Sequence, residues 1–166
     1  MEEKTAKKTE VLVFTKGTAF LHVGELCAEI VRKGYHIVDS ELMFLPDDVV
    51  RQHYTHVVDE PFFPEILNLF REHPVFLMKV CGTVDGIKSV VGKETDPLSC
   101  ELFSFRSQRG KDKTDNAAHR SGSEEDAKKE IAFFFGKNGV VANYRRNPMA
   151  KIGFYNKLAA YTMKNT

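Results

Sequence analysis

The sequence has almost no net charge and no long apolar run. Its 24 lysines and arginines are balanced by 23 aspartates and glutamates, which gives a formal charge of +1. A chain balanced in this way has no overall attraction to nucleic acid or to an acidic membrane surface. Apolar runs such as 75–78 and 131–135 are far shorter than the roughly 20 residues that a membrane-spanning helix needs. We therefore expect no membrane partner, and any affinity for anions must come from a local group of basic residues.

Cysteine is scarce, and the three cysteines present are scattered. Cys27, Cys81 and Cys100 form no CxxC pair and have no metal-ligand spacing. Such a set is typical of reduced thiols in a cytoplasmic protein. Residues 1–10 are charged and lack the apolar core of a secretory signal, which agrees with a cytoplasmic location.

Internal repeats and low-complexity segments are also lacking. With 166 residues, 18.9 kDa and 42% hydrophobic residues, the chain has the size and composition of one globular domain. We expect a charged N-terminal tail over 1–10, one folded domain over 11–146 and a C-terminal helical extension over 147–166.

Hydrophobic periodicity predicts an alternation of strands and helices. Strands are expected over 11–15, 35–45, 74–80 and 117–119, and a polar stretch over 93–116 reads as a long functional loop. Helices are expected over 24–33, from Pro46 onward, and over 61–73, 83–91, 124–135 and 147–164. This order predicts an α+β fold, a ferredoxin-like split βαβ antiparallel sheet covered by helices.

The last expected helix has an apolar face that something must cover. Asn147 is placed to cap it, and its apolar residues are Ile152, Tyr155, Leu158 and Ala159. Either the same domain or a neighbouring subunit covers this face.

One segment resembles a phosphate-binding P-loop but lacks its essential glycine. Residues 82–89 follow an apolar strand and enter a helix, and they include Lys88 and Ser89. A P-loop needs glycine directly before the lysine, so that bare backbone amides can wrap the phosphates. Ile87 occupies that position, which argues against a P-loop.

A histidine stands at a more informative position, between a short apolar strand and a capped helix. His119 precedes Ser121, and Ser123 caps the helix that follows. Neutral imidazole is a nucleophile near neutral pH and can accept a phosphoryl group. Taken alone, however, this local sequence favours a simpler interpretation, a surface histidine beside a helix cap.

An ordered series of short motifs gives that histidine a context. The series runs through Gly24, His53-Tyr54, Glu60-Pro61-Phe62-Phe63, Thr95-Asp96-Pro97, Arg106 and the segment 116–123. In order and spacing, from about residue 11 to 135, it resembles the nucleoside diphosphate kinases, and the loop over 110–116 is nearer to a divergent branch of that family. The resemblance identifies 11–146 as a kinase domain.

The resemblance implies transfer of the terminal phosphate of ATP to nucleoside diphosphates through a phosphohistidine. It makes His119 the nucleophile, with Glu130 holding its other ring nitrogen and with Ser121 and Tyr54 touching the transferring phosphate. It further implies Mg²⁺ carried on the nucleotide phosphates and a homo-oligomer, either a hexamer or a tetramer. For nucleotide binding it implies Lys16, Phe62, Lys88, Thr95, Arg106 and Asn116, with Phe62 stacking on the base and Lys16 and Asn116 reaching the sugar.

Four departures from the family pattern stand beside these matches. The loop after Lys16 is about two residues shorter, and Lys88 replaces an arginine. Lys113 replaces an apolar residue that covers the base, and Arg120 replaces the glycine after the catalytic histidine.

Two other functions remain open from the sequence. One is a catalytically weakened, kinase-like module for nucleotide sensing or protein contacts, in which the departures are signs of decay. The other is nucleic-acid binding by a basic cluster of Arg106, Arg109, Lys111, Lys113 and Arg120. Interspersed acids and the near-zero net charge argue against nucleic acid as the main partner.

Overall fold

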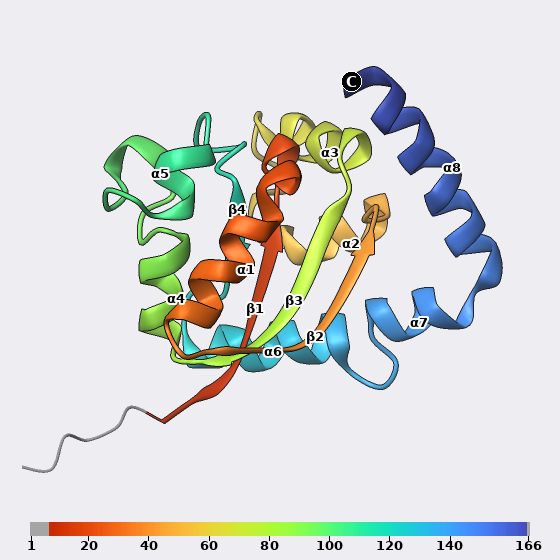
Figure 1. The fold of residues 1–166 in the computed structure, drawn as a ribbon. Helices are drawn as coiled ribbons and strands as arrows, with labels where there is room; N and C mark the ends of the chain where they lie inside the picture. The colour runs from red at the N-terminus through yellow and green to blue at the C-terminus, as the bar shows by residue number, and fades with distance from the viewer. Residues whose placement is uncertain (1–6, 166) are drawn as a thin grey trace, which may run out of the picture.

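In the computed structural model, which describes residues 7–165, a sheet is covered by helices on both faces (Figure 1). The strands are β1 (Thr9–Thr15), β2 (His36–Met43), β3 (Val75–Gly82) and β4 (Ala118–Arg120). The helices are α1 (Val23–Arg32), α2 (Asp47–His53), α3 (Phe63–Glu72), α4 (Val84–Val91), α5 (Phe105–Arg109), α6 (Glu124–Phe135), α7 (Val140–Arg146) and α8 (Pro148–Asn165). Short 3-10 helices are η1 (Gly17–His22), η2 (Thr55–Val57) and η3 (Pro97–Ser99).

Within residues 7–165 the sheet has four strands in the order β2-β3-β1-β4, and every neighbouring pair is antiparallel. Helix α1 follows β1, and helix α4 joins β3 to β4. This is the ferredoxin-like split βαβ arrangement, so the expected α+β fold is confirmed. The short strand β4, which carries His119, lies at one edge of the sheet beside β1.

The central strand β1 is buried on both faces because helices cover each side of the sheet. Leu12 and Phe14 join the core formed with α2, α3 and α6, and Val11 and Val13 join the core formed with α1 and α4. Successive side chains of a strand point to opposite faces. His119 pairs with Phe14 across the sheet and stacks on its ring, so it belongs to the α6 side.

Local capping signals account for several of the helix ends. Ser123 accepts a hydrogen bond from the Asp126 amide at the start of α6, and Asn147 accepts bonds from the first amides of α8. Gly34 follows two residues after the end of α1. Its φ of 78° is the left-handed conformation that glycine favours at such a helix end. Two helices were missed: α5, inside the stretch expected to be a loop, and α7.

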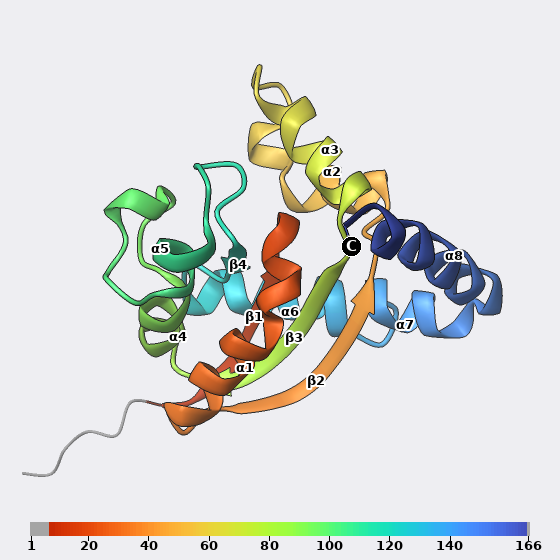
Figure 2. The ribbon, with the colours of Figure 1, turned by 45° about the horizontal axis from the view of Figure 1, so that its top comes forward.

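The C-terminal helix turns toward its own domain a different face from the apolar face noted in the sequence. Ile152 and Tyr155 are 53% and 65% exposed, whereas Phe154 and Tyr161 are buried. Phe154 packs against Phe44. Tyr161 contacts the rings of Phe20, in η1, and His73, directly after α3. Figures 1 and 2 show α7 and α8 on the β2 side of the sheet. Aromatic partners on the domain, rather than the apolar count of the helix, decide which face turns inward.

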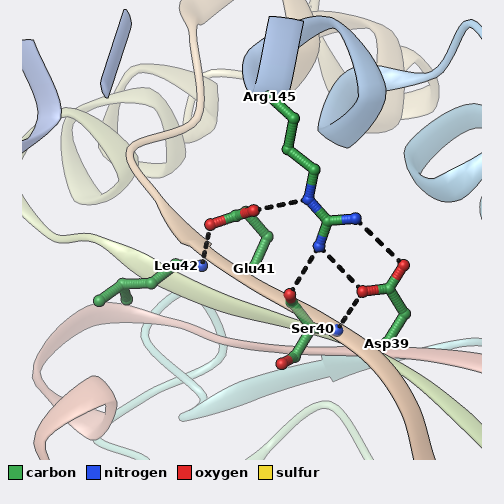
Figure 3. Close-up of polar contacts among 5 residues, drawn as sticks. All are labelled: Asp39, Ser40, Glu41, Leu42 and Arg145. Carbon is green, nitrogen blue, oxygen red and sulfur yellow. Dashed lines mark hydrogen bonds and ion pairs between the residues drawn. The ribbon is translucent and has the colours of Figure 1, made fainter. Parts of the chain in front are cut away.

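Arg145 of α7 fastens this C-terminal region to the edge strand β2 (Figure 3). Its guanidinium donates to both oxygens of Asp39, at 2.9 and 3.3 Å, and to Glu41 at 2.8 Å. It also donates to the backbone carbonyl of Ser40 at 2.9 Å. The hydrogen bonds from Arg145 hold the pKa of Asp39 below its usual value, as expected for a paired carboxylate.

The ends of the chain are described in part. Of the charged tail expected over 1–10, residues 1–6 lie outside the described residues. Thr9 and Glu10 belong to β1, so the first strand begins earlier than expected. No helix in the described part of the chain is long and apolar enough to cross a membrane.

Candidate active site

A pocket of about 990 Å³ opens beside the end of β4, at the upper end of the range for small-molecule sites. Every residue that the sequence assigned to the site lines it, except Ser121 and Lys88. The residues brought together are Lys16, Tyr54, Phe62, Thr95, Arg106, Asn116, His119 and Glu130. Segments distant in the sequence therefore meet in one cavity.

A strained turn directs the chain into β4. Ala117 has φ 73°, a left-handed conformation rare for a residue with a side chain, and the Ala118 amide donates to the Asn116 carbonyl at 2.9 Å. This is a tight three-residue turn of the rarer kind. Such strain costs on the order of 1–3 kcal/mol and gathers at functional sites. Asn116 and His119, on either side of the turn, both line the pocket.

His119 is held at one ring nitrogen only. Its Nε2 lies 2.9 Å from Oε2 of Glu130, and the same oxygen accepts a hydrogen bond from the Ser121 hydroxyl at 2.8 Å. The ring stacks on Phe14 with centroids 4.7 Å apart. Among the described residues, none hydrogen-bonds Nδ1. A carboxylate accepts, so the Nε2 nitrogen carries the proton and Nδ1 keeps its lone pair.

Burial and positive neighbours keep this imidazole neutral. Burial lowers the pKa of His119 well below its usual value, and the charges of Lys16 and Arg106 lower it further. Burial also raises the pKa of the Glu130 carboxyl, against the opposing effect of the Ser121 hydrogen bond. The His119–Glu130 contact is therefore a hydrogen bond from a neutral ring to a carboxylate, rather than an ion pair.

Two buried cations stand near His119. Lys16 is only 4% exposed, and burial, aided by the charge of Arg106, lowers its pKa to about 7. Arg106 is 5% exposed, and burial lowers its pKa to about 10. The Arg106 guanidinium donates to the carbonyls of Ala118 and Glu94, which ties the 92–95 segment to β4. Buried positive charge of this kind calls for an anion.

Two buried polar atoms in the pocket wall have no hydrogen-bond partner among residues 7–165. They are the Tyr54 hydroxyl and the Asn116 side-chain oxygen. Asn116 uses its amide nitrogen to bind the Thr95 carbonyl at 3.2 Å, which turns its oxygen away from that bond. A buried polar group without a partner costs about 1–3 kcal/mol, so both atoms are suited to a polar ligand.

The structure places Ser121 and Lys88 outside the pocket lining. Ser121 is fully buried; its hydroxyl accepts from the Leu12 amide and donates to Glu130. It therefore positions Glu130 and extends the pairing of β4 with β1. Lys88 lies on α4 and does not line the pocket.

Sequence reasoning gave no role to His53, although its ring lies against that of His119. The rings of His53 and His119 meet edge to face with centroids 4.5 Å apart. Burial lowers the pKa of His53 to about 3, so its ring is neutral at physiological pH. The only signal in the sequence was its position directly before Tyr54. Arg120 also lines the pocket.

His53, His119 and Glu130 form the one metal-ligand group found among the described residues, with ligand atoms within 4.8 Å of one another. Two imidazoles and a carboxylate suit Zn²⁺ better than Mg²⁺, which prefers oxygen ligands. The lining of the pocket offers no comparable cage of carboxylates, because its acids are Asp126 and Glu130. This wall fits a Mg²⁺ ion that arrives on nucleotide phosphates.

Comparisons with known proteins agree with the family resemblance. The family model described as nucleoside diphosphate kinase matches residues 7–140. A nucleoside diphosphate kinase of Bacillus cereus is 32% identical over 137 residues, covering 81% of this chain and 92% of the relative. One from Staphylococcus haemolyticus is 35% identical over 115 residues, covering 68% and 76%.

Solved structures show the same fold. The nucleoside diphosphate kinase of Encephalitozoon cuniculi superposes with a TM-score of 0.71 at 24% identity, covering 76% of this chain and 88% of that one. A nucleoside diphosphate kinase family protein from Babesia bovis gives 0.68 at 28% identity, covering 74% and 85%. The chain belongs to the nucleoside diphosphate kinase family of phosphotransferases.

Proposed function

We propose that this protein moves the terminal phosphate of a nucleoside triphosphate, with ATP as donor, to nucleoside diphosphates through a phosphate held on Nδ1 of His119. One observation carries this proposal: a neutral imidazole, fixed through Nε2 to Glu130, presents its other nitrogen in a pocket with buried cations. A nucleophile with its lone pair available and its orientation fixed is what attack on phosphorus requires.

In the first half-reaction, the Nδ1 lone pair attacks the terminal phosphorus. The bond from that phosphorus to the bridging oxygen breaks, and the nucleoside diphosphate leaves with the electron pair. The Nε2 proton stays between His119 and Glu130, and the carboxylate offsets the positive charge that the ring acquires. In the second half-reaction, a terminal oxygen of another diphosphate attacks the phosphorus, the bond from phosphorus to Nδ1 breaks, and its electron pair returns to Nδ1 to restore the neutral histidine.

The pocket walls supply groups that match the parts of a nucleotide. Lys16 and Arg106 balance the charge of the phosphates, and the Tyr54 hydroxyl donates to the transferring group. The Asn116 oxygen accepts from a sugar hydroxyl. Phe62 is 41% exposed at the pocket rim and is available for stacking, while Phe63 is buried in the core.

The ion, the assembly and the location follow from the same proposal. Mg²⁺ would be carried on the nucleotide phosphates, where it would neutralise part of their charge. We include a closed homo-oligomer, because Leu98, Leu102 and Phe103 are 94%, 78% and 75% exposed on one segment. Free thiols at Cys27, Cys81 and Cys100 suit the reducing cytoplasm.

The two alternatives from the sequence gain little support. His119, its partner Glu130 and the buried cations Lys16 and Arg106 all line the pocket. The departures from the family pattern have therefore not separated these residues. The basic cluster is partly neutralised, since Arg109 pairs with Glu25 at 2.7 Å and Lys111 with Asp115 at 3.6 Å. A paired cation offers less charge to a nucleic-acid backbone.

Initial-rate kinetics test the proposal. One site that serves donor and acceptor in turn predicts ping-pong behaviour, so double-reciprocal plots at several acceptor concentrations will be parallel. The matched control is exchange between ATP and labelled ADP: the label should enter the ATP pool without any other nucleotide present. Intersecting plots, which require both nucleotides to be bound together, would overturn the proposal.

A further inference from the structure

Arg120 lies directly after His119 and is one of the residues that line the pocket. It is the last residue of β4, the edge strand, and pairs with Val13 of β1. From this edge its Nε donates to the Gly92 carbonyl at 3.3 Å, and one Nη donates to the Lys93 carbonyl at 2.7 Å. The guanidinium therefore lies beside the 92–93 backbone, next to the pocket that Arg120 lines.

These two hydrogen bonds leave donors unused. An arginine has five N–H donors, and Arg120 uses two of them on the described residues. The two backbone bonds fix the guanidinium plane, which reduces the entropy lost when a ligand binds. The remaining donors form a fork of the kind that binds phosphate oxygens in pairs.

A second guanidinium stands beside the first. Arg106 also donates to the Gly92 carbonyl, at 3.4 Å, so two cationic side chains share one backbone oxygen. Two positive charges that share one partner repel each other. After burial, the charge of Arg120 is the next cause of the lowered pKa of Arg106. No carboxylate is hydrogen-bonded to either guanidinium within the described residues. An anion between or beside them relieves that repulsion.

Lys88, which the resemblance assigned to nucleotide binding, is placed differently. It lies on α4, outside the pocket lining, whereas Arg120 lies inside it. We propose that Arg120, rather than Lys88, binds the terminal phosphates of the nucleotide together with Lys16 and Arg106. The two departures from the family pattern then form one exchange: a phosphate-binding cation has moved from α4 to the end of β4. This inference rests on the proposed function.

Binding of ADP to the Mg²⁺-loaded protein tests this assignment in three variants. Arg120→Gln should weaken ADP binding by about 10- to 100-fold, the usual loss for a charge-assisted hydrogen bond to phosphate. Arg120→Lys, which keeps the charge but not the fork, should lose less. The matched variant Lys88→Gln removes the same charge from α4 and should change ADP affinity by less than about twofold.

A structural role for Arg120 makes a different prediction. If Arg120 acts only by holding the 92–93 carbonyls, Arg120→Gln will weaken ADP and AMP by the same factor. A phosphate contact predicts a larger loss for ADP than for AMP, and saturating ATP should still place label on His119. Equal losses for ADP and AMP, or a loss in Lys88→Gln with none in Arg120→Gln, would overturn the inference. Absence of label on the unmodified protein would instead refute the proposed function.

Discussion

The Nε2 atom of His119 lies 2.9 Å from a carboxylate oxygen of Glu130, which stands eleven residues further along the chain on α6. This contact decides which ring nitrogen of His119 is available. Because Glu130 accepts, Nε2 keeps the proton and Nδ1 keeps the lone pair. The Ser121 hydroxyl donates to the same oxygen and holds the carboxylate in place.

Replacing Glu130 by glutamine should slow phosphorylation of His119 without abolishing it. The neutral amide cannot offset the charge that the ring acquires, and a charge-assisted hydrogen bond contributes about 1.5–3 kcal/mol, or about 10- to 100-fold in rate. Single-turnover measurements with ATP give this rate directly. Ser121→Ala should cost less, because it only loosens the carboxylate. Equal rates in Glu130→Gln and the unmodified protein would contradict the orienting role.

Tyr54→Phe should separate stability from activity. The Tyr54 hydroxyl is buried without a partner among the described residues, so its removal should leave the ligand-free protein equally stable or more stable, by up to about 1 kcal/mol. Turnover should fall, because the hydroxyl that donates to the transferring phosphate is gone. Thermal unfolding and steady-state rates measure both effects. A clear loss of stability with unchanged turnover would show that the hydroxyl is structural.

Nucleotide binding should depend on pH through Lys16. Its pKa is about 7 in the ligand-free protein, below the usual 10.5, and bound phosphates favour the charged amine. Binding should therefore weaken as pH rises above 7, and binding at pH 8 should take up protons. Calorimetry in buffers of different ionisation enthalpy measures this uptake. In Lys16→Met the uptake should disappear; its persistence would assign the proton to another group.

The same lowered pKa affects folding, with a defined sign. The unfolded chain binds the Lys16 proton more tightly than the folded protein does. The ligand-free protein therefore loses stability as pH falls from about 10.5 to 7, and Lys16 adds no further change below that window.

Arg145→Met should release the C-terminal region from β2. The side chain is 40% exposed, so solvent screens its ion pairs, and we expect a loss of about 1 kcal/mol in the free energy of unfolding. Arg146→Met is the matched control on the same helix. Among the described residues, Arg146 donates only to the exposed Lys137 carbonyl, and the change there should stay within about 0.5 kcal/mol. Identical effects of the two substitutions would argue against the role of Arg145 in holding the C-terminal region on β2.

Most of the fold could be predicted because its signals are local. The alternation of strands and helices and the caps at Ser123 and Asn147 lie within a few residues of the elements that they define. Helix α5 was missed since five residues are too few for a periodicity, and its cap, Ser104, stands in a polar stretch. The inward face of α8 depends on the rings of Phe44 and Phe20, which the helix sequence does not contain.

The site was predicted through the resemblance, and the structure adds what motifs cannot show. Motif spacing identified His119 and Glu130, which meet, and Phe62, which stands at the pocket rim. Motifs could not show that Ser121 is buried behind Glu130, because its orientation depends on the pairing of β4 with β1. Nor could they place the side chain of Arg120, which reaches carbonyls 27 and 28 residues away.

The most direct measurement is the position of phosphate on the protein itself. After incubation with labelled ATP and Mg²⁺ and removal of nucleotide, the account predicts acid-labile label on His119, bonded to Nδ1 and not to Nε2. Nitrogen and phosphorus NMR of the phosphorylated protein distinguishes the two ring atoms. The label should leave on addition of a nucleoside diphosphate and should be absent in His119→Ala. Label that persists in His119→Ala, or phosphate on Nε2, would contradict the central claim.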